Sequence, residues 1–250
     1  MYPFYIILAY SFISLLCPLL FAGYTYNADL CTCRTPHLCG TCEMSTYNGN
    51  DAQISTFWNE RFGQDAYIYG KEPNEYFRSV IDKLPPGRLF VPGAGEGRDA
   101  VYAATLGWEV HCLDLSAEGR RKALLLAAER GVTIHYDVQS IAEATFPDGH
   151  FNMIASVFFH LPTAIRHRFY ADAHRWLSPG GVFLMEAFTP AQLANTSGGP
   201  KDPDMLVDAA TVKTDLAQFH ILRIAEEEPT LAEGSHHSGK ANVVDVLALR

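Results

Sequence analysis

The chain has 250 residues, of which 48% are hydrophobic and 19% are charged, and its formal net charge is −9. This length and hydrophobic content suffice for one sizeable core, and a single α/β domain commonly has this size. The negative charge and the lack of a cluster of lysines and arginines argue against a nucleic-acid partner, because neutralising phosphates requires a basic surface. A small-molecule partner fits better.

The first 43 residues have a composition of their own. Residues 4–23 form an apolar run close to the length of a membrane span. No lysine or arginine precedes Arg34, so the charged region of a secretory signal and the orientation cue of a membrane anchor are both missing. A mispredicted start, with translation beginning at Met44, explains both absences. We therefore expect a cytoplasmic protein whose domain spans residues 44–250, with a membrane-anchored protein as the alternative.

Four cysteines in this N-terminal segment are spaced rather like those of a zinc knuckle or a disulfide knot. They are Cys31, Cys33, Cys39 and Cys42. No hydrophobic residues surround them to build a supporting shell, so incidental cysteines in a flexible segment are the favoured interpretation. His236 and His237 superficially resemble a metal pair, but adjacent histidines without a nearby carboxylate on a helix face are usually exposed loop residues. We expect no metal site.

Residues 55–84 show a helical pattern and an unusual density of aromatic side chains. These are Phe57, Trp58, Phe62, Tyr67, Tyr69, Tyr76 and Phe77. Such density usually indicates core packing. The alternative is a set of N-terminal lid helices over a ligand, in which Gly70 provides the turn that lets Tyr69 face inward.

The stretch from Arg88 to Asp99 is an apolar run that breaks into three alternating glycines and then becomes helical. Glycine tolerates positive φ and lets another molecule approach where a Cβ would clash, so Gly93, Gly95 and Gly97 mark a close-contact turn. Such a turn at the carboxyl end of a first parallel strand is where doubly wound α/β sheets bind nucleotides.

The next predicted strand, residues 108–113, ends in Asp114, a carboxylate that can hold a ribose diol. Arg98 stands where the dinucleotide fingerprint requires its third glycine. The turn therefore predicts a ligand with a single nucleoside and no pyrophosphate.

Three later strands bring further side chains to the same edge of the sheet. Residues 132–136 lead to Asp137 and Val138, residues 151–157 contain Ser156 and lead to His160, and residues 182–187 contain Glu186. Two more strands, over residues 218–226 and 241–249, complete the set. The pattern predicts an α/β fold with a doubly wound, Rossmann-like seven-stranded sheet, mostly parallel with an antiparallel C-terminal strand.

Several short motifs occur between about Ile54 and the C-terminus. They are Phe57-Trp58-Asn59-Glu60-Arg61-Phe62 with Tyr69-Gly70, Gly95-Glu96-Gly97-Arg98, Phe159-His160-Leu161-Pro162, Leu177-Ser178-Pro179-Gly180-Gly181 and Gly198-Gly199-Pro200-Lys201-Asp202-Pro203. Through these motifs the sequence resembles the class I S-adenosylmethionine-dependent methyltransferases. Within that superfamily it looks most like the small tellurite-resistance and thiopurine-type methyltransferases. Val91 departs from the pattern, because many members carry an acidic residue there, and one contact to the amino-acid end of the cofactor is missing as a result.

The resemblance implies S-adenosyl-L-methionine as the cofactor. We expect it to be bound by Trp58, Tyr69, Gly93, Gly95, Gly97, Asp114, Leu115, Asp137, Val138 and Ser156. In this assignment Asp114 holds the ribose and Asp137 accepts from the adenine amino group. The aromatic rings of the lid shield the positively charged sulfonium.

The expected reaction transfers the methyl group to a small-molecule acceptor, with a thiol or a chalcogen oxyanion favoured because the fourth strand offers few bases. The catalytic candidates are His160, Arg98 and Glu186. His160 can orient the acceptor or remove a proton, Arg98 can bind an anionic acceptor, and Glu186 can line the acceptor pocket. Each has a structural alternative: a helix cap for His160, a solvated charge for Arg98 and a salt bridge for Glu186.

Two other functions stay open. The first is a catalytically silent S-adenosylmethionine-binding module that works through partners. The second is a nicotinamide-dependent oxidoreductase, which the glycine spacing and Pro179-Gly180-Gly181 oppose.

Overall fold

The computed structural model describes residues 51–250, which belong to one compact unit. The apolar run and the four clustered cysteines lie outside the described residues, so the predictions made for them stay predictions. Within residues 51–250, no helix is both long enough and apolar enough to cross a membrane.

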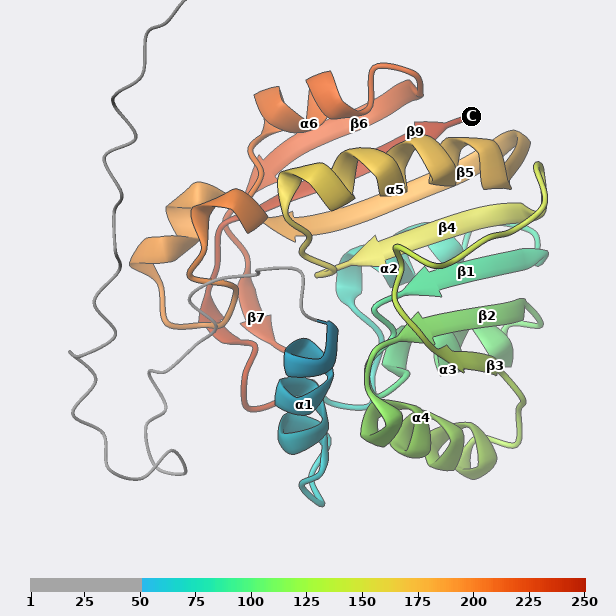
Figure 1. The fold of residues 1–250 in the computed structure, drawn as a ribbon, viewed down its shortest axis with the longest axis vertical. Helices are drawn as coiled ribbons and strands as arrows, with labels where there is room; N and C mark the ends of the chain where they lie inside the picture. Colours follow the sequence, from blue (N-terminus) through green and yellow to red (C-terminus); the bar gives the residue numbers. More distant parts are fainter. Residues whose placement is uncertain (1–50) are drawn as a thin grey trace, which may run out of the picture. The chain divides into compact units, whose positions relative to one another are not determined.

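A seven-stranded sheet forms the centre of this unit, in the order β3-β2-β1-β4-β5-β9-β6 (Figure 1). Its strands are β1 (Arg88–Pro92), β2 (Glu109–Asp114), β3 (His135–Val138), β4 (Phe151–Val157), β5 (Leu177–Phe188), β6 (His220–Glu227) and β9 (Val243–Leu249). β9 is antiparallel to both of its neighbours, and the other pairs are parallel. The prediction of a mostly parallel, seven-stranded sheet with an antiparallel C-terminal strand is confirmed. A small hairpin, β7 (Thr230–Ala232) and β8 (Ser238–Lys240), interrupts the chain between β6 and β9.

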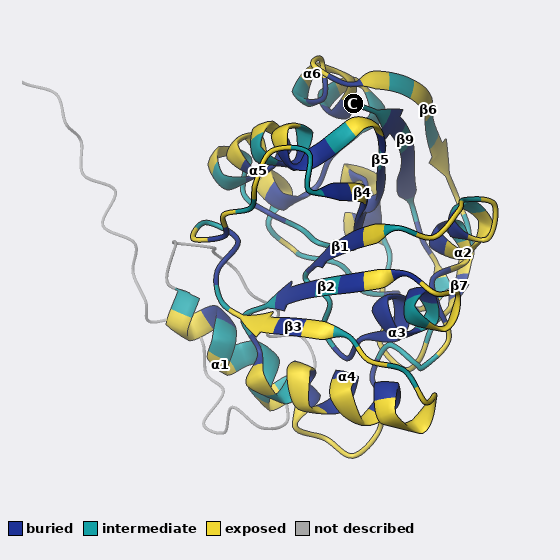
Figure 2. Cartoon of the chain, turned by 90° about the vertical axis from the view of Figure 1, so that its right-hand side faces the viewer, coloured by how far each residue is buried: buried dark blue, intermediate teal, exposed yellow. Residues whose placement is uncertain are grey.

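Helices cover both faces of the sheet, as expected of a doubly wound fold. On one face α5 (Thr163–Trp176) and α6 (Ala209–Asp215) pack on β1, β4, β5 and β9. On the other face α2 (Glu75–Ile81) and α3 (Arg98–Thr105) pack on β1, β2, β4 and β5. The central strands are therefore buried from both sides, as Figure 2 shows by their dark blue colour. The carboxyl ends of the strands are left free to carry a site.

The predicted helical region over residues 55–84 consists of two helices with an irregular segment between them. α1 (Asp51–Phe62) ends at Gly63, whose N–H donates to the Asn59 carbonyl at 2.8 Å. α2 begins only after Asn74, whose side chain caps the helix by accepting from the Phe77 N–H at 2.8 Å. The third strand also starts later than predicted, because the Val132 N–H still closes the end of α4 (Ala117–Glu129).

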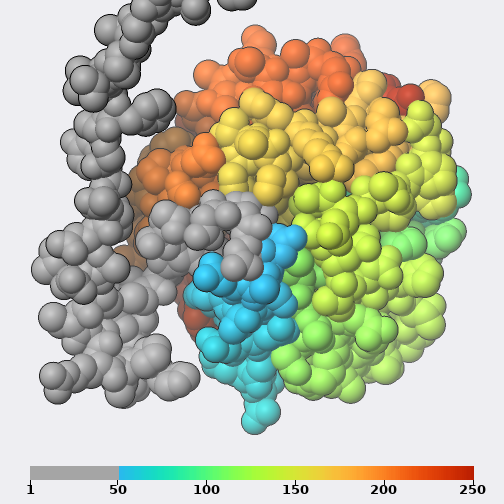
Figure 3. All heavy atoms as spheres, viewed as in Figure 1, coloured from blue at the N-terminus to red at the C-terminus, as the bar shows by residue number. Residues whose placement is uncertain are grey.

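Helix α1 is fixed to α4, and the two lie against each other at the surface (Figure 3). Asn59 on α1 accepts hydrogen bonds from the Ser116 hydroxyl at 2.8 Å and from the Glu118 N–H at 3.0 Å. The Ser55 hydroxyl adds a bond to the Leu115 carbonyl at 2.8 Å. Two neighbouring side chains of α1 thus hold the start of α4 and the end of β2 together.

The segment between α1 and α2 is tied down by a buried ion pair. Glu96 Oε2 accepts from the N–H groups of Ile68 and Tyr69 at 2.8 and 3.3 Å, and its Oε1 lies 2.5 Å from Lys122 Nζ. Lys122 also donates to the carbonyls of Gln64 and Ala66. Removing one partner of such a buried pair costs ~3–5 kcal/mol, because the other charge is left without compensation. The segment is therefore an integral part of the core.

Candidate active site

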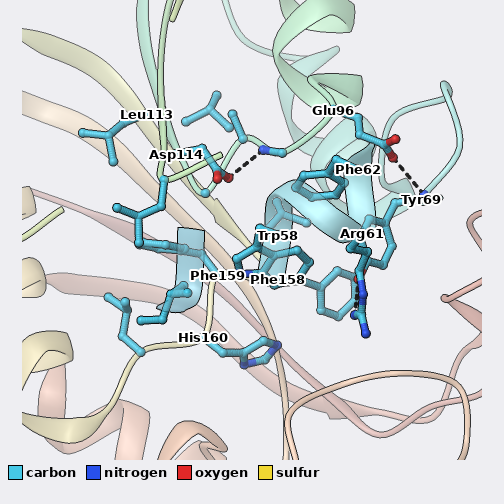
Figure 4. A pocket seen from close by; sticks show the side chains of 18 of the residues that line it. Trp58, Arg61, Phe62, Tyr69, Glu96, Leu113, Asp114, Phe158, Phe159 and His160 are labelled. Carbon is cyan, nitrogen blue, oxygen red and sulfur yellow. Dashed lines mark hydrogen bonds between the residues drawn. The ribbon is translucent and has the colours of Figure 1, made fainter. Parts of the chain in front are cut away.

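One cavity opens at the carboxyl ends of β1, β2 and β4 and is covered by α1 and the segment that follows it (Figure 4). It encloses about 1520 Å³ of empty space, its open mouth included. The residues that line it differ in chemistry, and its walls fall into two halves.

The glycine turn after β1 forms the floor of the first half. Gly93 and Gly95 have φ values of 62° and 50° and line the cavity. A Cβ on Gly93 would lie 2.3 Å from the Phe159 ring, and one on Gly95 would lie 3.2 Å from the Phe62 ring. Both positions therefore require glycine because aromatic side chains of the cavity approach the backbone there.

Gly97 does not reach the cavity, although it was predicted to bind the cofactor. Its φ is 86°, and an added Cβ would lie 2.5 Å from the Cβ of Ala123 on α4. Gly97 therefore lets α3 and α4 pack closely, which is a requirement of the fold.

Asp114 and Leu115 border the cavity at the end of β2, as predicted. Asp114 accepts hydrogen bonds from the Gly95 N–H and the Ser116 N–H, both at 2.9 Å. Burial raises the pKa of this carboxyl, against the opposing effect of the backbone N–H groups. Each carboxylate oxygen can accept two hydrogen bonds, so Asp114 retains capacity for ligand hydroxyls.

Three other predicted cofactor residues are placed elsewhere by the structure. Asp137 is exposed, with an oxygen 3.3 Å from His111 Nε2, and Val138 is 45% exposed. Ser156 is buried within β4. None of the three lines the cavity. Asp137 and Val138 miss it because β3 ends at Val138, and only the residues that follow border the cavity. The cavity wall at this point is formed by Gln139, Ser140 and Ile141.

The cover of the first half is aromatic. The rings of Trp58 and Phe62 stack with centroids 5.2 Å apart, and Tyr69 lies 6.4 Å from Trp58. Arg61 joins them, with its guanidinium carbon 4.5 and 5.4 Å from the Phe57 and Trp58 ring centroids. Its Nη1 donates to the Tyr69 hydroxyl at 3.2 Å. Arg61 was not predicted, but its position three residues after Trp58 on one helix face was a usable signal.

The second half is bordered by Phe158, Phe159, His160 and Phe188, which we call the aromatic wall. Phe158 has a φ of 49°, a left-handed conformation that non-glycine residues rarely adopt. Its N–H donates to the Glu186 carbonyl at 2.8 Å, and its ring stacks on Phe188 at 4.6 Å. Strained backbone of this kind is found at functional sites, where the surroundings hold it in place.

His160 lies in the wall with its ring parallel to Phe188, at a centroid distance of 5.4 Å. Its Nδ1 is 3.2 Å from the Met205 carbonyl oxygen, so Nδ1 carries the proton and Nε2 is the basic nitrogen. Nε2 is buried and has no hydrogen-bond partner. Burial lowers the pKa of His160 to about 4, which keeps the ring neutral at pH 7.

The other two catalytic candidates are already occupied by protein partners. Arg98 borders the cavity, but it donates to Glu233 at 2.9 Å and to the Tyr69 carbonyl at 3.1 Å. Glu186 does not line the cavity; it accepts a hydrogen bond from the Asn74 side chain. Burial, together with the nearby carboxylates of Asp245 and Glu233, raises the pKa of Glu186 to about 8. The alternative role of Glu186 as a salt-bridge partner is not met by Arg98, which pairs with Glu233 instead.

The structure corrects the prediction for the adjacent histidines. His236 is exposed, but His237 is only 6% exposed and borders the cavity. The β7–β8 hairpin folds back over the site, so a loop residue becomes part of its wall. Nothing in the local sequence signals this, because the contact depends on the hairpin reaching across to Tyr69 and Phe158.

The segment from Pro92 to Gly181 contains the glycine turn, Asp114 and most of the aromatic wall. It matches the family model described as a methyltransferase domain, over residues 92–181. We call residues 92–181 the methyltransferase domain, after the model that they match. The match agrees with the predicted enzyme class.

The methyltransferase domain also has a curated relative, the 2-heptyl-1-hydroxyquinolin-4(1H)-one methyltransferase of Mycobacteroides abscessus. It is 32% identical over 134 residues, which are 52% of this chain and 59% of the relative. The chain thus matches somewhat more than half of that protein's length.

Solved structures share the fold of the methyltransferase domain. A structure on the conversion of a disulfide bond into a thioacetal group during echinomycin biosynthesis has a TM-score of 0.64 at 18% identity, over 79% of this chain and 92% of that one. TehB from Haemophilus influenzae has a TM-score of 0.59 at 14% identity, over 78% of this chain and 66% of that one. At this identity the likeness establishes the fold, and the predicted closeness to tellurite-resistance and thiopurine-type enzymes stays a prediction.

Proposed function

We propose that this protein is an S-adenosylmethionine-dependent methyltransferase that methylates a hydroxyl group on a flat aromatic small molecule. The observation that carries the proposal is the division of the cavity. A polar turn with a carboxylate lies on one side, and an aromatic wall lies on the other. The first fits a nucleoside cofactor and the second fits an aromatic acceptor.

The residues of the first half, which we call the cofactor half, suit S-adenosylmethionine. Asp114 has free acceptor capacity for the ribose hydroxyls, beside a turn that glycines keep open. Gln139, Ser140 and Ile141 border the space for the adenine. The cofactor supplies a methyl group on a positively charged sulfur.

Two groups of the cover match the remaining parts of the cofactor. The faces of Trp58 and Tyr69 can stabilise the sulfonium through cation–π contacts. Arg61 can pair with the cofactor's carboxylate, since its guanidinium has donors beyond the bond to Tyr69. Arg61 would then hold the carboxylate at the amino-acid end of the cofactor, where Val91 offers no polar group.

The second half, which we call the acceptor half, favours an aromatic hydroxyl over an oxyanion. The predicted anion-binding residue, Arg98, already pairs with Glu233. The aromatic wall offers rings for stacking, and His160 Nε2 is a buried acceptor that a donor group of the ligand can satisfy. The curated relative acts on a hydroxyquinolone by its name, which supports the same chemical class.

Calorimetric titration of the full chain with S-adenosylhomocysteine, and separately with NADH, tests the cofactor. Micromolar binding of the first and none of the second is expected. Binding of NADH alone would instead support a nicotinamide-dependent oxidoreductase.

Methylation assays with 1-hydroxyquinolin-4(1H)-one, 4-nitrothiophenol and tellurite then test the acceptor class. We expect product with the hydroxyquinolone. Methylation of tellurite or of the thiol, without methylation of the hydroxyquinolone, would instead support the soft nucleophiles predicted from the sequence. A protein that binds S-adenosylhomocysteine yet methylates none of a wide panel would be a silent binding module.

A further inference from the structure

The β7–β8 hairpin places a histidine at the acceptor half of the cavity and a carboxylate next to that histidine. Glu233 Oε2 lies 3.3 Å from His237 Nδ1, and both side chains are about 90% buried. His237 is packed between the rings of Tyr69 and Phe158, with centroid distances of 4.5 and 4.6 Å. The histidine therefore has a fixed position beside the aromatic wall.

Glu233 is itself held in place by two other elements. Its Oε2 accepts from Arg98 at 2.9 Å, and its Oε1 accepts from the Asn74 side chain at 3.0 Å. Although burial opposes ionisation, hydrogen bonds from His237 and the charge of Arg98 lower the pKa of Glu233. Glu233 is therefore an anion at neutral pH, and its partner nitrogen on His237 must carry a proton. The second nitrogen of His237, Nε2, is left as the basic one.

The two histidines at the acceptor half differ in the hydrogen-bond partner of their Nδ1 atom. His160 donates to a backbone carbonyl, which does little to stabilise a positive ring. His237 donates to a carboxylate, which stabilises the imidazolium that forms when Nε2 takes up a proton. A histidine with a fixed carboxylate partner is suited to receive a proton during a reaction, and a histidine with a carbonyl partner is suited to accept a hydrogen bond.

We infer that His237, oriented by Glu233, is the general base that takes the proton from the hydroxyl of the methyl acceptor. The inference rests on the proposed function and extends it to a residue outside residues 92–181. As the acceptor oxygen forms its bond to the methyl carbon, the methyl–sulfur bond breaks and its electron pair stays on the sulfur. The hydroxyl proton passes to His237 Nε2, and it leaves to solvent after the product. His160 then holds a second donor group of the acceptor.

The pH dependence follows from all the titratable groups around the His237 ring. These are Tyr69 from the lid, Arg98 from α3, His160 after β4, and Glu233 and His236 from the hairpin. Burial and Arg98 favour the neutral ring, whereas Glu233 favours the charged one. Activity therefore rises with pH as His237 loses its proton, and Glu233→Gln moves this rise to lower pH while decreasing the maximal rate.

Kinetics of His237→Gln with a graded series of phenols, from phenol to 4-nitrophenol, test the inference at pH 8. General-base catalysis contributes ~10²–10⁴-fold, so kcat for weakly acidic phenols should fall by about 10²-fold or more. The loss should vanish for 4-nitrophenol, which is already ionised. His220→Gln, at an exposed position on β6 that does not line the cavity, should leave kcat unchanged for the whole series. His160→Gln should raise KM more than it lowers kcat.

The same loss for every phenol would show that His237 only packs against the acceptor, and no loss for any would exclude it from the reaction. Either result overturns the inference while the proposed function stands. A wild-type chain that methylates no phenol and no hydroxyquinolone would overturn both.

A second measurement does not depend on turnover. In ¹⁵N NMR of the histidine-labelled chain, the signals lost in His237→Gln identify this ring. We expect a proton on Nδ1 and none on Nε2, and a lower pKa of His237 in Glu233→Gln than in the wild type. A proton on Nε2, or the same pKa in both proteins, would contradict the assignment.

Discussion

The two halves of the cavity obtain their shape in different ways. The cofactor half is built from the ends of two adjacent parallel strands, where Asp114 and the Gly95 N–H hold each other at 2.9 Å. The acceptor half is assembled from loops after β4 and β5 and from the β7–β8 hairpin, and its contacts are ring against ring. Sheet geometry thus fixes one half, whereas the other can change without disturbing it. Folds of this kind keep one site constant and vary the neighbouring one.

The largest change within the cofactor half is expected from Asp114→Ala. A charged hydrogen bond contributes ~1.5–3 kcal/mol, and Asp114 is expected to make two to the ribose while also holding the Gly95 N–H. Calorimetry should therefore show a tenfold to hundredfold loss of affinity for S-adenosylhomocysteine. Unchanged affinity in a folded protein would remove Asp114 from the site.

Gly97→Ala distinguishes a fold requirement from a ligand requirement in the same turn. The new Cβ meets Ala123 at 2.5 Å in a left-handed backbone conformation, so we expect ~2–3 kcal/mol of destabilisation from overpacking and strain. Gly131→Ala is the matched control, because it has a φ of 68° but nothing within 4 Å of the added atom. Chemical denaturation should show a smaller loss of stability for Gly131→Ala than for Gly97→Ala. Equal losses would mean that backbone conformation alone accounts for Gly97.

Glu186→Gln tests the buried acidic groups behind the acceptor half. Because the pKa of Glu186 is raised to about 8 in the folded protein, the folded state holds a proton that the unfolded state releases at lower pH. Folding stability must then fall as pH rises from about 5 to about 8. This fall should be smaller in Glu186→Gln than in the wild type, measured as Tm against pH. The exposed Glu228→Gln should keep the wild-type slope, and an identical slope in both variants would contradict the raised pKa.

Asp137→Ala should have the smallest effect. The side chain is exposed and faces His111, away from the cavity. We expect a change in S-adenosylhomocysteine affinity of less than about twofold, and a larger loss for Gln139→Ala, which lines the cavity. A larger loss for Asp137→Ala would restore the original prediction of an adenine contact.

The fold and several residues of the cofactor half could be predicted from the sequence because their signals are local. Short, largely apolar strands, and glycines that must adopt a left-handed backbone, can be recognised from a few neighbouring residues. Gly93, Gly95 and Asp114 were placed correctly at the cavity for that reason. Asp137 was predicted in place of Gln139 because strand ends are uncertain by a residue or two, and Gln139, two residues further along, is the one that borders the cavity.

The residues of the acceptor half could not be predicted from local sequence signals. His237 reaches the cavity only because the β7–β8 hairpin, which begins 49 residues after residue 181, folds back onto it. Glu186 was expected to face the acceptor, but its side chain is taken up by Asn74, which comes from the start of α2. Arg98 was expected to be free, and Glu233 from the hairpin neutralises it. Each of these outcomes depends on a partner distant in the sequence.

The ion pair of Glu96 and Lys122 has a consequence for how a ligand enters and leaves. Because Glu96 bonds the amides of Ile68 and Tyr69, these protons should exchange slowly with solvent even in the empty protein. We therefore expect the segment after α1 to stay in place over the cavity, and the exchange of these two amides to be equally slow with and without a ligand.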